Sequence, residues 1–146
     1  MIDEIHLNEV TLSDAEFLYE LLQNRDEIVN ISHKKMPNFT EHINFISSKP
    51  YTKWHIVNFG KKKIGSVYLS KQNEIGIFLK NEFRNMGFGK IILDLIIKQN
   101  PRNRFLANVN PKNENSQLFF KKNGFKLIQY TYELAPKDNK DNEKQN

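Results

Sequence analysis

The stretch Arg84-Asn85-Met86-Gly87-Phe88-Gly89-Lys90 decides the fold of this chain of 146 residues. An apolar run at residues 74–79 precedes it, and an amphipathic run from about Gly87 to Gln99 follows it, which predicts a strand and then a helix. Glycines let the backbone turn tightly and approach a ligand without an intervening Cβ. The free amides and dipole of a helix start favour an anion such as a pyrophosphate, although an ordinary strand-to-helix turn has the same signature.

Outward from this stretch, the chain alternates between strand-like and helix-like runs. A helix is expected after a capping box at Ser13 and Glu16, with Arg25 at its end. A second helix starts at Thr40 and closes at Pro50, the third spans 87–99, and Asn113 caps a fourth that ends at Asn123-Gly124. The expected strands are residues 5–11, 53–58, 63–69, 74–79, 104–109 and 125–134.

The predicted order is β-α-α-β-β-β-α-β-α-β, which is an α/β fold, or α+β in some schemes. A hairpin meander leads into a β-α-β crossover, so we expect a twisted mixed sheet, antiparallel early and parallel around the crossover, with helices on both faces. The length suits a single domain at residues 1–135. Residues 136–146 form a polar, charge-mixed tail that we expect to be disordered.

Composition narrows the classes of function. There is no cysteine, which excludes disulfides, thiolate metal sites and an acyl-cysteine intermediate. With only four histidines we infer no metal site. The net charge of +5 suits anionic ligands, but the lysines are scattered, so we expect no nucleic-acid partner. No apolar run approaches the length of a membrane span, and the acidic start does not resemble a secretory signal, so a cytoplasmic location is expected.

Two motifs resemble those of the GNAT superfamily of acetyltransferases. The first family signature, Arg/Gln-x-x-Gly-x-Gly/Ala after the fourth strand, is matched by residues 84–89. The second, Asn-x-x-Ala-x-x-x-Tyr followed by Gly-Phe, is similar to Asn113, Ser116, Phe120 and Gly124-Phe125. The two motifs occur in the family's order and within a matching order of strands and helices. The resemblance covers roughly residues 4–135 and implies an acetyl-coenzyme A-dependent N-acetyltransferase that transfers the acetyl group directly to a primary amine.

The resemblance implies a role for each matched position. Backbone amides of the loop would hold the pyrophosphate, the backbone of Leu79 would pair with pantetheine and polarise the thioester carbonyl, Asn113 would contact the pantetheine arm, and Phe120 would pack near the thiol. The implied cofactor-binding residues are Phe78, Leu79, Arg84, Asn85, Met86, Gly87, Phe88, Gly89, Lys90, Asn113, Ser116 and Phe120.

The catalytic groups are less sharply indicated. Glu74, His42 and Ser66 are the candidates for removing the amine proton: Glu74 through water, His42 because imidazole titrates near neutral pH, and Ser66 as a relay. Each could equally be a solvated or structural side chain. Family members often use a tyrosine as the acid where this chain has Phe120, so water, Tyr130, Tyr132 or unaided departure of the thiolate would serve.

A narrower resemblance concerns the acceptor. Arg25 and residues 39–46 resemble acetyltransferases of the pseudaminic acid pathway, which act on the 4-amino group of a UDP-linked deoxyamino sugar. This likeness implies acceptor contacts from Arg25, His42 and Asn108, although the group's fifth-strand glutamate is replaced by Asn108. The alternatives are acetylation of protein amines, including ribosomal-protein N-termini, and a degenerate module that only binds coenzyme A. Because residues 125–134 contain no clear turn, we expect one long or bent strand here, which would leave an open edge and predicts a homodimer.

Overall fold

The computed structural model describes residues 4–25 and 36–136. Its centre is an antiparallel sheet in the order β1-β2-β3-β4, formed by β1 (Ile5–Glu9), β2 (Lys53–Phe59), β3 (Lys62–Leu69) and β4 (Ile75–Leu79). Gly60 makes the turn between β2 and β3 with a φ of 59°. A register shift between Val57 and Asn58 marks an irregularity in the β2–β3 pairing.

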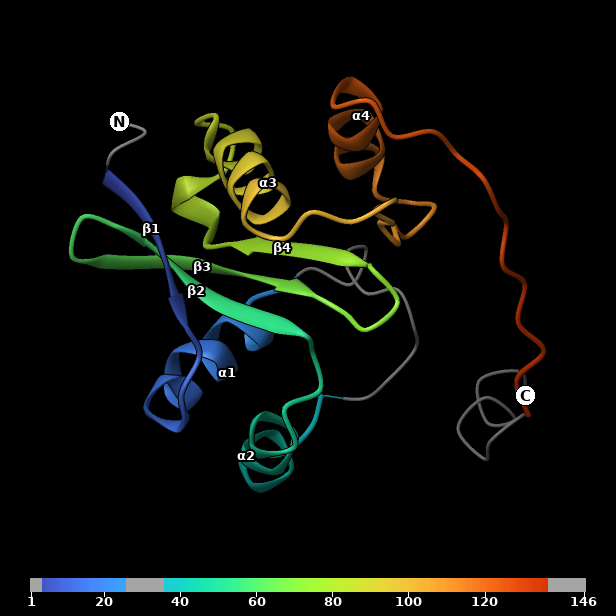
Figure 1. The fold of residues 1–146 in the computed structure, drawn as a ribbon. Coiled ribbons are helices and arrows are strands. Elements are labelled where there is room, and N and C mark those ends of the chain that lie inside the picture. Colours follow the sequence, from blue (N-terminus) through green and yellow to red (C-terminus); the bar gives the residue numbers. More distant parts are fainter. Residues whose placement is uncertain (1–3, 26–35, 137–146) are drawn as a thin grey trace.

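Helices cover both faces of this sheet (Figure 1). The 3-10 turn η2 (Leu12–Asp14), α1 (Ala15–Gln23) and α2 (Phe39–Ser47) lie on one face. The 3-10 turn η4 (Asn81–Phe83), α3 (Phe88–Gln99) and α4 (Glu114–Lys122) lie on the other. The predicted layering is therefore confirmed.

Alternation along the strands supplies each face with its own core, because successive strand side chains point to opposite sides. Val57, Ile64 and Val67 are fully buried with Phe88 and Ile92 of the α3 face. A smaller cluster on the other face joins Ile56 to buried side chains of α1 and α2, namely Ala15, Leu18 and Ile46. The sheet is thus held from both sides, and β4, at its far edge, lies between the two helix layers.

Several sequence-based predictions were wrong in detail. The sheet is antiparallel throughout its named strands, and the predicted strand at 104–109 is reduced to a parallel bridge between Glu74 and Leu106. Residues 125–134 form no strand, because residues 126–134 make no backbone hydrogen bond with the other described residues. The first capping box uses Thr11 and Asp14, with the Thr11 amide donating to Asp14 Oδ2 at 2.9 Å, rather than Ser13 and Glu16.

The other helix ends lie close to their predicted places. Asn38 caps α2, one residue before Phe39, by accepting a 2.8 Å hydrogen bond from the Glu41 amide. The predicted stop at Asn123-Gly124 is confirmed, since Gly124 has a φ of 91° and Phe125 N–H donates back to Phe120 O at 2.9 Å.

Some expectations fall outside what the structure tests. The predicted tail, apart from Pro136, lies outside the described residues. Within the described ranges, none of the helices is long and apolar enough to cross a bilayer. The same ranges contain no cluster of three His, Asp or Glu side chains suited to a metal ion.

Candidate functional site

The outer edge of β4 carries unpaired backbone groups. Ser70 N–H donates to Glu74 O and Lys80 N–H donates to Ile64 O, both at 2.8 Å, so alternate residues of β4 bond to β3. The residues between them, Ile75, Ile77 and Leu79, therefore direct their amides away from β3. Ile75 N–H is taken by Leu106 O at 2.8 Å, but in the described chain no backbone acceptor meets the amides of Ile77 and Leu79.

A gap thus opens beside the last part of β4. The segment that carries Leu106 bonds to β4 only around Asn73, Glu74 and Ile75, through Leu106 N–H to Asn73 O and the Ile75 contact. Beyond this point the two backbones separate. An extended ligand with amide groups could bond to the two free amides as another strand would, which fits the predicted position of a pantetheine arm at Leu79.

The loop after β4 has the backbone of an anion cradle. Asn85 and Gly87 both have positive φ, 61° and 84°, so the chain turns sharply just before α3. Gly87 is the N-cap of α3, and no side chain among the described residues caps the first amides of this helix. Phe88 is 1% exposed and anchors the helix start in the core. The free amides and the positive end of the helix dipole consequently face outward, where a phosphate could bind.

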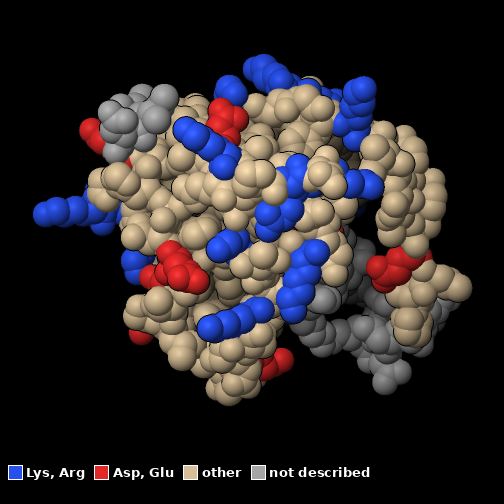
Figure 2. All heavy atoms as spheres, in the orientation of Figure 1, with Lys and Arg blue, Asp and Glu red and all other residues tan. Residues whose placement is uncertain are grey.

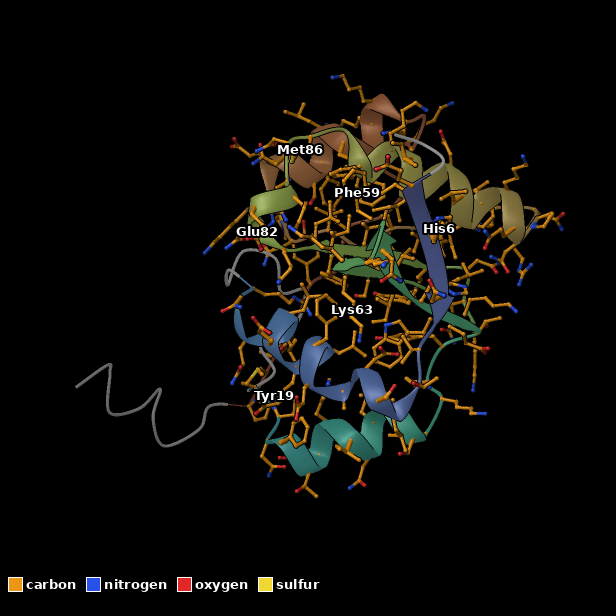
Figure 3. The ribbon with its side chains drawn as sticks, turned by 90° about the vertical axis from the view of Figure 1, so that its left-hand side faces the viewer. His6, Tyr19, Phe59, Lys63, Glu82 and Met86 are labelled. Atoms are coloured by element: carbon orange, nitrogen blue, oxygen red, sulfur yellow. The ribbon has the colours of Figure 1, made fainter. Side chains whose placement is uncertain are left out.

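Gly87 and Gly89 are required for different reasons. A Cβ on Gly87 would meet nothing within 4 Å, so this glycine is required by its left-handed backbone alone. A Cβ on Gly89 would lie 3.0 Å from Phe119 Cε1, so this glycine lets α4 pack closely on α3. Met86 is 55% exposed at the tip of the loop, on the far side of the sheet from Tyr19 (Figure 3).

Helix α4 borders the same region. Asn113 caps it by accepting a 3.1 Å hydrogen bond from Ser116 N–H, so both predicted residues lie in its first turn. The Phe120 ring packs against Phe119 and Phe125, with centroids 5.1 Å apart in each pair. Phe120 brings no hydroxyl group, and Lys121 and Lys122 beside it are exposed.

On the side of β4 opposite to the α3 layer, the carboxylate of Glu74 is hydrogen-bonded. Glu74 Oε1 accepts from Ser70 Oγ at 2.9 Å, and Glu74 Oε2 accepts from Asn108 Nδ2. Ser70 Oγ also accepts from the Glu74 amide at 3.0 Å. The structure therefore brings together two residues, Glu74 and Asn108, that the sequence predicted separately as a catalytic and a substrate-binding candidate.

An aromatic surface adjoins this carboxylate. Tyr68 lies across Gly76, where an added Cβ would be only 2.1 Å from Tyr68 Cε2. Tyr51 stacks on Tyr68 with centroids 4.0 Å apart and planes 8° apart, and Tyr68 stacks in turn with Phe78 at 6.2 Å. Arg25 covers Phe78, with its Cζ 4.0 Å from the ring centroid. The Phe78 ring, predicted as a cofactor contact, therefore lies on this surface.

The Arg25 side chain is a partly buried cation. Its Nε is inaccessible to solvent and has no hydrogen-bond partner among the described residues. Desolvation lowers the pKa of Arg25, and the nearby Tyr68 and Tyr51 oppose this shift. Burial also raises the pKa of Tyr51 to about 12, so both its hydroxyl and that of Tyr68, whose pKa shifts the same way, stay protonated at neutral pH. The surface can therefore donate hydrogen bonds to an anionic ligand.

The other two catalytic candidates, His42 and Ser66, are buried. His42 is 5% exposed between α1 and α2, and its ring contacts Tyr19 and Phe39. No contact joins it to Glu74 in the parts of the chain described, and desolvation lowers its pKa. Ser66 is 3% exposed in the middle of β3, opposite Phe78. Glu74 lies at the bridge to Leu106, next to which the gap begins, whereas His42 and Ser66 are buried.

Sequence reasoning missed Tyr51, Tyr68 and Ser70. Tyr68 has the same strand parity as Ser66, so its face could have been inferred from the alternation of β3. The glycine that accommodates its ring, Gly76, was a second available signal. Tyr51 precedes its strand and carried no comparable signal. Lys and Arg side chains are scattered over the face shown in Figure 2 and do not form a stripe.

Comparison with known proteins agrees with this geometry. Residues 4–126 match the family model described as the acetyltransferase (GNAT) domain. The chain therefore belongs to the GNAT family of acetyltransferases, whose enzymes use acetyl-CoA as co-substrate. This confirms the predicted family and the predicted acyl donor.

The relatives differ in what they acetylate. The peptidyl-lysine N-acetyltransferase YjaB of Escherichia coli (strain K12) is 31% identical over 74 residues, which is 51% of this chain and 49% of that protein. The match thus spans about half the length of the curated relative. None of the relatives named here is described as acting on an amino sugar.

Solved structures support the fold. An acetyltransferase from Thermus thermophilus superposes with a TM-score of 0.68 and 15% identity, covering 86% of this chain and 88% of that one. A spermidine N-acetyltransferase mutant from Vibrio cholerae gives a TM-score of 0.68 and 16% identity, with 87% and 82% covered. An acetyltransferase of Salmonella typhimurium that modifies the N-terminal serine of ribosomal protein L7/L12 gives 0.66 and 15%, with 84% and 80% covered. The α+β GNAT-like fold follows from these likenesses.

Proposed function

We propose that this chain transfers the acetyl group of acetyl-CoA directly to the primary amine of an acceptor bound on the aromatic side of β4. The single observation that carries the proposal is the pair of free amides at Ile77 and Leu79, beside a loop whose helix-start amides are also free. Together they provide partners for pantetheine and for the pyrophosphate along one continuous path. The absence of cysteine favours direct transfer over an acyl-enzyme.

In this mechanism the Leu79 amide stabilises the developing oxyanion of the thioester carbonyl. A preorganised donor of that kind contributes about 3 kcal/mol to the barrier reduction. The acceptor amine must lose a proton to become nucleophilic, since an alkylammonium has a pKa of about 10 in water. Glu74 takes this proton through water, and Asn108 and Ser70 hold its carboxylate in place.

The thiolate of coenzyme A departs without a protein acid. Phe120 occupies the position where family members often have tyrosine, and it has no proton to give. A thiol has a pKa of about 8.5, so its thiolate is a competent leaving group near neutral pH.

Arg25 indicates what the acceptor carries besides its amine. The Nε of Arg25 is buried without a hydrogen-bond partner among the described residues, which is costly, and an anionic group on the acceptor would offset that cost. Tyr51 and Tyr68 add hydroxyl donors on the same surface. A sugar nucleotide fits this requirement through its diphosphate, whereas a polyamine would place more positive charge beside Arg25. A second candidate is a protein lysine, which is favoured by the likeness to a peptidyl-lysine acetyltransferase.

A thiol-release assay with an amine panel tests this proposal. The panel holds a UDP-linked 4-amino sugar, a lysine peptide, a peptide with a free N-terminal serine, and spermidine. We expect turnover with an anionic acceptor, and Arg25→Gln should raise its KM at least tenfold while the Kd of acetyl-CoA stays unchanged. Saturable acetyl-CoA binding without thiol release for any amine would instead indicate a binding module, which contradicts the proposal.

A further inference from the structure

The proposed reaction separates its base from its reacting amine along β4. The thioester would lie beside Leu79, whereas the proposed base, Glu74, precedes Leu79 by five residues. At about 3.3 Å per residue, the backbone between them spans about 16 Å. A single water that bonds to two oxygen atoms spans about 5.6 Å, which is twice a typical O···O distance of about 2.8 Å. Even with the reach of the Glu74 side chain, the proton needs a further group on its path.

Strand β4 has no side chain of its own that can carry the proton across this distance. Alternate residues of a strand share a face, so Glu74, Gly76 and Phe78 all lie on the side opposite to the α3 layer. Gly76 has no side chain, and the Phe78 ring has no exchangeable proton. Arg25, whose Cζ is 4.0 Å from the Phe78 ring centroid, is always charged and cannot accept a proton.

The Tyr68 hydroxyl lies at the missing position. Tyr68 is directly opposite Gly76 in the register of β3 and β4. Its Oη is 2.7 Å from the point where a Cβ on Gly76 would be, so the hydroxyl lies over β4 between Glu74 and Leu79. Within residues 4–25 and 36–136, no protein group forms a hydrogen bond with this hydroxyl. Its donor and acceptor sites are therefore available to a bound amine and to a water.

The charged groups around this hydroxyl keep it protonated. Burial raises the pKa of Tyr68, the Glu74 carboxylate raises it further, and the Arg25 guanidinium opposes this shift. The neighbouring titratable group is the Tyr51 hydroxyl, on the ring that stacks on Tyr68 at 4.0 Å. A neutral phenol can accept one proton while it donates its own. The effect of Glu74 on the pKa also means that the carboxylate and the hydroxyl share one environment.

We infer that the Tyr68 hydroxyl relays the proton of the acceptor ammonium to Glu74. The hydroxyl oxygen accepts this proton as its own proton passes through one water to the Glu74 carboxylate. One N–H bond of the ammonium breaks, the phenol is regenerated, and the carboxylate becomes a carboxylic acid. The amine that attacks the thioester is then neutral, and Glu74 returns the proton to solvent before the next turnover. This inference rests on the proposed function and names the group that connects its base to the amine.

Tyr68→Phe keeps the stacked ring and removes the relay. With the panel amine of highest kcat/KM, we expect kcat at pH 7 to fall about 100-fold, while the Kd of acetyl-CoA changes less than twofold. The amine must then lose its proton to solvent, so the rate of the variant should rise about tenfold per pH unit toward the amine pKa of about 10. The deficit should therefore shrink as the pH rises. A merely structural role would lower the rate equally at every pH.

Tyr51→Phe is the matched control, because it removes a hydroxyl from the same stack but not the one over Gly76. It should change the acceptor KM and keep the wild-type dependence of kcat on pH. Thiol release that Tyr68→Phe leaves unchanged, or the same loss of kcat in both variants, would overturn the relay and leave the proposed function intact. A wild-type chain that releases no thiol with any amine would contradict the proposed function and the relay together.

NMR of isotope-labelled tyrosine side chains tests the geometry without turnover. Glu74→Gln should lower the pKa of the Tyr68 hydroxyl, because the carboxylate raises it in the native chain. An unchanged pKa would mean that the carboxylate is too far from the hydroxyl for one water to join them, which would overturn the relay.

Discussion

Gly76→Ala separates the acceptor surface from the cofactor site. The added Cβ would lie 2.1, 2.4 and 2.7 Å from Tyr68 Cε2, Cζ and Oη, which are distances that no real methyl group tolerates. The Tyr68 ring must therefore move away from β4, which disturbs its stacking on Tyr51 at 4.0 Å. The amides of Ile77 and Leu79 are not displaced by this movement, because they lie on the outer edge of the strand.

The size of the effect follows from these contacts. Overpacking in a well-packed region costs about 1–3 kcal/mol, and a lost aromatic pair costs about 0.5–1.5 kcal/mol. We expect Gly76→Ala to lower the free energy of unfolding by about 2 kcal/mol and to raise the acceptor KM at least tenfold. The Kd of acetyl-CoA, measured by calorimetry, should change less than twofold.

A double-mutant cycle with Tyr68→Ala tests the reasoning. Once the ring is gone, Gly76→Ala has nothing to displace and should cost less than about 0.5 kcal/mol, so the coupling energy is about 1–2 kcal/mol. Chemical denaturation of the four proteins measures it. If the effects of the two substitutions on the free energy of unfolding are additive, the Tyr68 ring does not pack against residue 76. The assignment of the acceptor surface would then lose its basis.

Three further predictions concern the loop before α3, the contact between α1 and α2, and the end of α4. Met86→Glu places a carboxylate beside the proposed diphosphate. Repulsion of about 0.8 kcal/mol from each of the two diphosphate charges, at about 5 Å in water, should weaken coenzyme A binding roughly tenfold, whereas the neutral Met86→Gln should not weaken it. Desolvation lowers the pKa of His42, so as the pH drops the unfolded chain binds a proton at this residue before the folded chain does. The free energy of unfolding should therefore fall as the pH drops below about 6.5. In thermal melts, His42→Leu should reduce this dependence of stability on pH, and an unchanged dependence would exclude His42 as its cause. Gly124→Ala should cost about 1 kcal/mol in denaturant unfolding because of the φ of 91°, and a neutral effect would mean that the cap is not formed.

The sequence predicted local structure well where chemistry and periodicity agreed. Gly87 before α3, the Asn113 cap and the Asn123-Gly124 stop are short-range signals, and each lies at its predicted helix end. The capping box was misplaced because Thr11 and Asp14 satisfy the same spacing as Ser13 and Glu16, and a 3-10 turn precedes α1.

Long-range pairing was the part that sequence could not determine. Residues 104–109 and 125–134 have strand-like patterns, but a strand needs a partner edge, and the position of that edge depends on how β4 and α4 are arranged. The acceptor surface also depends on contacts between residues far apart in the sequence. Tyr51 and Tyr68 are 17 positions apart, and only the β2–β3 hairpin brings them into contact.

Amide NMR during a titration with coenzyme A tests the central claim most directly. The account predicts saturable shifts and increased exchange protection at the amides of Ile77 and Leu79 and at those of Phe88, Gly89 and Lys90, while Ile75, already bonded to Leu106, changes little. Saturable binding that leaves the Ile77 and Leu79 amides unprotected, or no binding by well-folded protein, would contradict it.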